Sequence, residues 1–158
     1  MKKVWFKTYG CTLNQSDTEA MKGLLEKAGF RAAASCAEAD IIIFNTCTVK
    51  DPTEKKFLYE LSKTKKPIVI AGCIPQAEVD GGAVSERFKG YSIVGVRQID
   101  KIVELVQETL KGRVIHLLDM KKNERLNLPK IRRNNLIEII PICNGCLGEC
   151  TYCKTRFA

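Results

Sequence analysis

The stretch Ile41-Ile-Ile-Phe-Asn-Thr-Cys47 contains four consecutive apolar residues, two polar residues and a cysteine. A continuous apolar run of this length is typical of a strand that is covered on both faces, as in the parallel sheets of α/β proteins. It therefore predicts a buried strand over 41–44, with Cys47 just beyond its carboxyl end.

Further β-prone runs lie on both sides of this strand. They are Lys3–Tyr9, Pro67–Ala71, Tyr91–Val94 and the weaker Val114–Leu118. Helical patterns separate them. Ser16-Asp-Thr-Glu19 has the form of a capping box that opens a helix closed by Gly29, and Asp51-Pro-Thr-Glu54 predicts a second helix start. Apolar residues at helical spacing between Ile99 and Leu110 predict a third helix. Alternating strands and helices favour an α/β fold around a mostly parallel sheet with flanking helices.

The composition excludes several classes of protein. The chain has 158 residues, 45% of them hydrophobic, with eight cysteines, one histidine and a net charge of +8. No apolar run approaches the roughly 18 residues of a membrane span, and the charged start does not resemble a signal peptide. We therefore expect a cytoplasmic protein whose cysteines serve metal or redox chemistry rather than disulfides.

The pattern changes after residue 120, so we expect a domain over 1–120, a linker over 121–135 and the start of a second domain over 136–158. Residues 111–135 hold eight Lys and Arg against two Asp and Glu, a net charge of +6. Such a segment is either a solvated connector or a phosphate-binding surface, and no aromatic residues are interleaved to stack on bases. The apolar run Leu136–Ile142 that follows predicts another strand.

Three cysteines follow three of the predicted strands: Cys11, Cys47 and Cys73. Because the carboxyl ends of parallel strands share one edge, we expect these thiols to lie close together. Three thiolates suit an iron–sulfur cluster with one open iron or a zinc ion with an exchangeable ligand, and buried packing is the plain alternative. Gly10 and Gly72 would allow tight turns before two of them.

A second group of cysteines is Cys143, Cys146, Cys150 and Cys153. The spacing Cys146-x3-Cys150-x2-Cys153 can wrap three thiolates around one cluster. The two CxxC pairs also suggest zinc, although zinc ribbons separate such pairs by about 15–20 residues. The order of spacings in bacterial ferredoxins differs as well.

These residues resemble the radical S-adenosylmethionine (SAM) methylthiotransferase family. Cys146-x3-Cys150-x2-Cys153, with Tyr152, looks like the radical SAM loop, and the three strand-end cysteines match the family's amino-terminal domain. Finer matches are to the archaeal and eukaryotic branch that modifies N6-threonylcarbamoyladenosine beside the tRNA anticodon. They are Asn45-Thr-Cys-Thr-Val-Lys50, Ala71-Gly-Cys-Ile-Pro-Gln76, Gly95-Val-Arg-Gln-Ile-Asp100 and Gly145-Cys-Leu-Gly-Glu-Cys-Thr-Tyr-Cys-Lys-Thr155.

The resemblance implies a Rossmann-like or flavodoxin-like amino-terminal domain and two [4Fe–4S] clusters. Cys146, Cys150 and Cys153 would hold the cluster that binds SAM, with Tyr152 nearby, and the strand-end cysteines would hold an auxiliary cluster. A radical formed from SAM would activate the adenine ring, and sulfur insertion and methyl transfer would follow. The substrate would be the anticodon stem-loop of tRNA. The resemblance leaves the electron donor and the oligomeric state open.

The departures from the family pattern are Cys36, Cys143 and the end of the chain at Ala158. We expect Cys36 to be a packing residue and Cys143 to be either an adventitious ligand or a packing residue at a strand end. A complete barrel needs about 250 residues, so we expect a fragment that is inactive alone and whose residues 143–158 are poorly packed. The only histidine, His116, is expected to be structural. The alternatives are a metal-binding or tRNA-binding module without catalysis, and a methylthiotransferase for isopentenyladenosine or a ribosomal protein.

Overall fold

The computed structural model describes residues 1–48, 51–78, 84–118, 127–143, 145–153 and 155; the side chains of 51–53 are also outside the description. Six parallel strands form one sheet in the order β2-β1-β3-β4-β5-β6. The strands are β1 (Lys3–Thr8), β2 (Arg31–Ala32), β3 (Ile41–Thr46), β4 (Ile68–Gly72), β5 (Ser92–Gly95) and β6 (His116–Leu117). This confirms the expected α/β fold.

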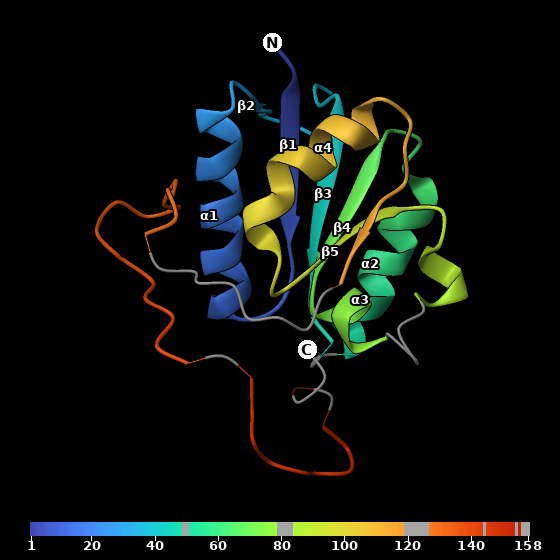
Figure 1. The fold of residues 1–158 in the computed structure, drawn as a ribbon, viewed down its shortest axis with the longest axis vertical. Helices are drawn as coiled ribbons and strands as arrows, with labels where there is room; N and C mark the ends of the chain where they lie inside the picture. Colours follow the sequence, from blue (N-terminus) through green and yellow to red (C-terminus); the bar gives the residue numbers. More distant parts are fainter. Residues whose placement is uncertain (49–50, 79–83, 119–126, 144, 154, 156–158) are drawn as a thin grey trace.

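Helices cover both faces of the sheet (Figure 1). They are α1 (Thr12–Lys27), α2 (Asp51–Lys63), α3 (Cys73–Ala77) and α4 (Ile102–Leu110), with the 3-10 turns η1 (Glu86–Phe88) and η2 (Ile99–Lys101). The described residues contain no helix that is long and apolar enough to cross a membrane.

Alternate residues of the central strands point to opposite faces, and each face has its own hydrophobic core. In β3, Ile41 and Ile43 pack with α1 and α4, whereas Ile42 and Phe44 pack with α2 and α3. Every residue of β3 and β4 is buried, as the continuous apolar runs predicted. The two cores hold the carboxyl ends of β1, β3 and β4 side by side at one edge of the sheet.

Two expectations for the first domain differ from the structure. The capping box at Ser16–Glu19 is wrong, because α1 already begins at Thr12 with Cys11 as its N-cap, and Ser16 and Glu19 lie buried within the helix. The edge strand β2 was not expected. It has only two residues, both exposed, and so gives no hydrophobic pattern from which a strand could be predicted.

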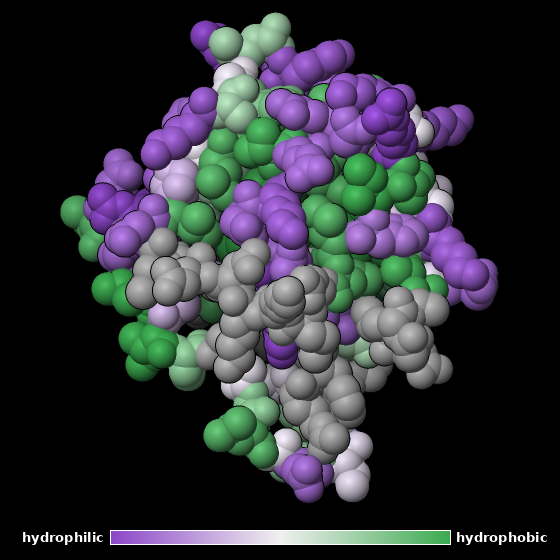
Figure 2. Space-filling model, in the orientation of Figure 1, coloured by the Kyte–Doolittle hydropathy of each residue, from purple (hydrophilic) through white to green (hydrophobic). Residues whose placement is uncertain are grey.

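The expected strand over Leu136–Ile142 is also wrong, since this segment is neither helix nor strand. A strand needs a neighbour for its backbone N–H and C=O groups, and no described strand lies beside this one. Its apolar side chains are exposed instead, Leu136 by 93% and Ile142 by 91%. Apolar surface is visible beside α1 and below it, where this part of the chain runs (Figure 2). The division at residues 120 and 121 falls outside the described residues.

Candidate metal centre

The fold brings three cysteines to one edge of the sheet. Cys11 follows β1 and caps α1, Cys47 follows β3, and Cys73 is the first residue of α3 after β4. Because β1, β3 and β4 are neighbours, their carboxyl ends place these residues side by side. This is also where the strand order reverses, since β2 and β3 flank β1 on opposite sides, and such a reversal is the usual ligand site of open α/β sheets.

The buried side chain of Asn14 lies at the centre of this group. Its Oδ1 accepts hydrogen bonds from Cys11 Sγ at 3.3 Å and from Cys73 Sγ at 4.0 Å. The sulfur atoms of these two cysteines are therefore no farther apart than the sum of the two distances. Cys47 is 2% exposed, and its Sγ and the Asn14 side chain both lie close to Gly10.

Two glycines allow the chain to close around this centre, as the sequence predicted. Gly10 has a φ of +98°, and a Cβ built on it would lie 2.7 Å from Cys47 Sγ and 3.6 Å from Asn14 Cγ. Gly72 has a φ of +96°, and its Cβ would lie 2.4 Å from the Thr46 carbonyl oxygen. Any side chain at either position would displace the loops that carry the cysteines.

The donor set consists of thiols, which can bind an iron–sulfur cluster or zinc as thiolates. In the described part of the chain, no group of three metal-ligating side chains is close enough to hold one metal ion as it stands. A four-iron cluster is wider than an ion, so its thiolates stand farther apart, and thiolates are the ligands such clusters require. None of the eight cysteines is used in a disulfide.

The second cysteine group forms an open loop. Cys146 and Cys150 are exposed and Cys153 is half-buried. A Cβ on Gly148 would lie 3.3 Å from Cys146 Sγ and 4.0 Å from Cys150 Sγ, so both sulfur atoms lie close to Gly148. Hydrogen bonding with Thr155 lowers the pKa of the Cys153 thiol, which favours the thiolate that a metal binds.

The sequence also singled out Tyr152, Cys143, Cys36 and His116. Tyr152 is 88% exposed and Cys143 is exposed. Cys36 is half-buried against the core on the α2 face, which fits the expected packing role. His116 lies exposed in β6, and its Nε2 is 3.1 Å from the Tyr91 carbonyl oxygen.

The segment between the two groups, residues 127–139, is docked on α1, and we call it the strap. Pro129 lies against Gly23, where an added Cβ would be 2.3 Å from the Pro129 carbonyl oxygen. The Ile131 N–H donates to the Glu19 carbonyl oxygen at 2.9 Å. Leu128 packs against the core on the α1 face. The described part of the predicted linker therefore contacts α1 and the core on the α1 face.

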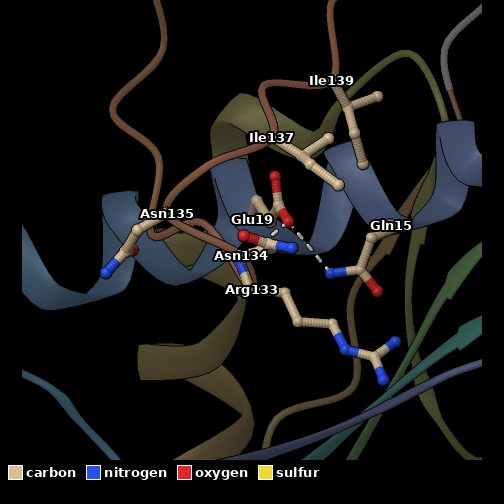
Figure 3. A pocket seen from close by; sticks show the side chains of 7 residues that line it. All are labelled: Gln15, Glu19, Arg133, Asn134, Asn135, Ile137 and Ile139. Carbon is tan, nitrogen blue, oxygen red and sulfur yellow. Dashed lines mark hydrogen bonds between the residues drawn. The ribbon is translucent and has the colours of Figure 1, made fainter.

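Glu19, which sequence reasoning placed in a capping box, anchors the strap. Its Oε1 accepts hydrogen bonds from Gln15 Nε2 at 3.2 Å and from the Arg133 N–H at 3.0 Å (Figure 3). The carboxylate lines a pocket of about 580 Å³ between α1 and the strap. The sequence contains one signal of this role: Glu19 is a charged residue that directly precedes Ala20 and Met21, which lie on the apolar side of the helix.

The strap runs along α1 toward the first cysteine group, which consists of Cys11, Cys47 and Cys73. It contacts Gly23 with Pro129 and Glu19 with Ile131, and at Ile139 its carbonyl oxygen is 3.5 Å from Ser16 Oγ. These contacts proceed from the middle of the helix toward its amino end, where Cys11 is the N-cap. The chain then continues past the carboxyl edge of the sheet (Figure 1).

Comparisons with known proteins agree with these observations. The family model described as "Uncharacterized protein family UPF0004" matches residues 3–94. The chain is 46% identical over 168 residues to a protein of Homo sapiens named threonylcarbamoyladenosine tRNA methylthiotransferase, and 46% identical to the Drosophila melanogaster protein of that name. It is 38% identical over 164 residues to a Pyrococcus abyssi protein named "Probable threonylcarbamoyladenosine tRNA methylthiotransferase".

These alignments cover nearly all of this chain but only part of each relative. They span 28% of the human protein, 30% of the fly protein and 38% of the archaeal protein. The similarity therefore concerns about a third of a longer polypeptide.

Proposed function

Because the chain belongs to the family UPF0004, whose model matches more than half of it, we propose that it shares the activity for which its relatives are named. That activity is the conversion of N6-threonylcarbamoyladenosine in tRNA to its 2-methylthio derivative. The chain would supply the metal-binding part of the enzyme, and the remaining two thirds of the relatives' length would supply the rest of the substrate site.

The observation that carries the proposal is the gathering of three thiols around Asn14 at the carboxyl edge of the sheet. Cys11, Cys47 and Cys73 would hold an auxiliary [4Fe–4S] cluster. Cys146, Cys150 and Cys153 would hold a second cluster, with SAM on its open iron and Tyr152 beside it. When bound, these groups supply the radical that activates the adenine ring and the sulfur and methyl groups that are transferred.

The strap supports a reaction that uses both sites. It leads the chain along α1 to Ile139, close to the edge that carries Cys11. Cys146 is seven positions after Ile139 in the sequence, and an extended chain of that length spans at most about 25 Å. The second cysteine group can therefore reach the first without rearrangement of the sheet.

The strap also offers a surface for tRNA. It carries Lys130, Arg132 and Arg133 against the single acidic residue Glu138, and both arginines are exposed. Cationic side chains on a fixed backbone can contact successive phosphates, so the strap would bind the anticodon stem-loop beside the clusters. A tRNA substrate is consistent with a cytoplasmic location.

Anaerobic reconstitution with iron and sulfide tests the two-site assignment. Two clusters predict about eight irons per chain, and Cys47→Ala and Cys146→Ala should each lose about half of that iron. Cys36→Ala, which removes a thiol from neither site, is the matched control and should bind as much iron as the unaltered chain. Variants at positions 47 and 146 that match this control would contradict the assignment.

The activity itself is tested in cells from which the full-length gene has been deleted. Mass spectrometry of tRNA nucleosides should show loss of the 2-methylthio group from threonylcarbamoyladenosine and its return with the intact gene. Loss of the modification from isopentenyladenosine, or from a ribosomal protein, would assign a different substrate. Unchanged modification of all three would favour a binding module without catalysis.

A further inference from the structure

Asn14 lies on the first turn of α1 and is 2% exposed, although its side chain is polar. Its amide reaches all three of the loops that end in the strand-end cysteines. Buried amides are costly unless every polar atom is paired, so the partners of Asn14 indicate what it does.

Asn14 and the end of β3 exchange hydrogen bonds. The Asn14 Nδ2 donates to the Thr46 carbonyl oxygen at 2.6 Å, and the Asn45 Nδ2 donates to the Asn14 carbonyl oxygen at 2.8 Å. Cys47 directly follows Thr46, and Cys11 precedes Asn14 by three residues. This exchange therefore fixes the spacing between the loops that carry Cys11 and Cys47.

The other end of the amide faces the sulfur atoms. Because Thr46 offers a carbonyl oxygen, the amide must turn its nitrogen toward β3 and its oxygen toward the thiols. That oxygen accepts from Cys11 Sγ at 3.3 Å and from Cys73 Sγ at 4.0 Å. The contact with Cys73 joins the third loop to the other two. Thr46 Oγ1 strengthens this connection by donating to the carbonyl oxygen of Ala71, two residues before Cys73.

We propose that Asn14 is the positioning residue of the strand-end site, holding the loops of Cys11, Cys47 and Cys73 at the spacing that a cluster requires. The inference rests on the proposed function, since it takes these three cysteines as the ligands. Asn14 is not itself a ligand. It orders the metal-free thiols toward one point, so that binding of the cluster costs less conformational entropy.

Aspartate is the informative substitution because it keeps the size of asparagine. Asn14→Asp removes the N–H donor to Thr46 and places a carboxylate oxygen against that carbonyl. It also puts a negative charge beside the thiolates. Asn14→Ser shortens the side chain and adds no charge, so a defect that both variants share reflects the lost amide contacts and not the charge of the aspartate.

The experiment uses the 158-residue chain with serine in place of Cys143, Cys146, Cys150 and Cys153, so that only the strand-end site binds iron. The chain is reconstituted anaerobically, and a ferrous chelator is added to measure the rate of iron loss. Loss of an outer partner of a metal site typically costs about 10- to 100-fold in affinity, so Asn14→Asp and Asn14→Ser should lose iron faster by about that factor. The electron paramagnetic resonance spectrum of the reduced cluster should change as well.

Thr18→Val is the matched control. Thr18 Oγ1 accepts from Asn45 Nδ2 at 2.9 Å and belongs to the same buried network, but no thiol bonds to it. This variant should lose stability in urea while its rate of iron loss and its spectrum stay those of the parent. Equal rates in the Asn14 variants and the parent would overturn the inference and leave the site intact. Unfolding of every Asn14 variant, with Thr18→Val folded, would overturn it too, by assigning Asn14 to stability. A parent that binds no iron would overturn the proposed function first.

Discussion

Gly10 shows how closely the backbone determines the strand-end site. Its φ of +98° disfavours any L side chain, and an added Cβ would lie 2.3 Å from Cys47 Cβ. Gly10→Ala should therefore lower the free energy of unfolding by about 2–5 kcal/mol, from backbone strain and overpacking together. Urea denaturation measures the loss, and the variant should also retain less iron after reconstitution, because Cys47 is displaced.

The matched control for this prediction is Gly29→Ala. Gly29 has a similar φ of +87°, but nothing lies within 4 Å of its added Cβ. Backbone strain alone should cost about 1–2 kcal/mol there, with iron content unchanged. If both variants cost the same and bind the same iron, the contact between Gly10 and Cys47 has no bearing on the site.

Cys153 differs from the other cysteines of the open loop because it interacts with Thr155. The interaction lowers the pKa of the Cys153 thiol, so the metal-free thiolate should persist to a lower pH than an ordinary cysteine thiolate. Thr155→Ala should raise that pKa and shift the pH midpoint of Cys153 alkylation upward, slowing its reaction at neutral pH. Mass spectrometry of peptides after timed alkylation measures this, with Cys143 as the internal reference. A midpoint that stays in place would show that Thr155 has no effect on the thiol.

At the scale of elements, the docking of the strap on α1 makes an unusual prediction for Gly23. Alanine in the middle of a helix is normally more stable than glycine by about 1 kcal/mol. Here the added Cβ would lie 2.3 Å from the Pro129 carbonyl oxygen and 2.7 Å from the Lys130 nitrogen, so helix and strap cannot both keep their places. Gly23→Ala should release the strap, and hydrogen exchange should accelerate at the amides of Ile131 and Arg133, which donate to Glu19.

Gly90→Ala serves as the control, since nothing lies within 4 Å of its added Cβ and it is remote from the strap in sequence. Exchange at Ile131 and Arg133 should stay at the parent's rate in this variant. A Gly23→Ala chain that gains stability and keeps slow exchange at both amides would show that the strap does not dock on α1 in solution.

The elements that the sequence predicted well are those whose pattern is local. The apolar runs of β3 and β4 and the helical spacing before Gly29 depend on the residues themselves. The start of α1 was wrong because the first turn is held by contacts from β3, which is 31 residues away from Asn14. Ser16–Glu19 satisfies the local capping rule, yet tertiary hydrogen bonds decide where the helix begins.

The candidate site likewise has features that could be predicted from the sequence and features that could not. Cysteines after parallel strands, and glycines before them, follow from the topology and could be predicted. The role of Asn14 and the docking of the strap could not be predicted. For the strap, the reason is that Glu19 and Gly23 meet residues 129–133 only after the chain has folded back over α1. No sequence pattern marks a backbone-to-backbone approach of this kind, except a glycine where a helix would favour alanine.

At the scale of the whole molecule, exposed cationic side chains lie on both faces of the sheet. The strap, on the α1 face, includes Arg132 and Arg133, whereas Lys55 and Lys56 are exposed on α2, which covers the opposite face. Lys130 and Arg132 form ion pairs with Glu138 at 2.8 Å and 3.5 Å, which hold these cations along one side of the strap. If the strap contacts tRNA, its arginines should matter more than lysines elsewhere.

Binding of an anticodon stem-loop RNA at several salt concentrations can therefore show whether RNA affinity depends on where the cationic residues lie or only on the net charge of the chain. Each lost phosphate contact reduces the slope of log K against log salt by about 1, so Arg132→Glu with Arg133→Glu should reduce it by about 1.5 to 2. Lys55→Glu with Lys56→Glu changes the net charge by the same amount on the α2 face and should leave the slope close to that of the parent. Equal slopes in the two double variants would mean that the RNA responds only to total charge. A smaller slope in the strap variant alone would place the RNA backbone on the face where the strap leads the second cysteine group toward the first.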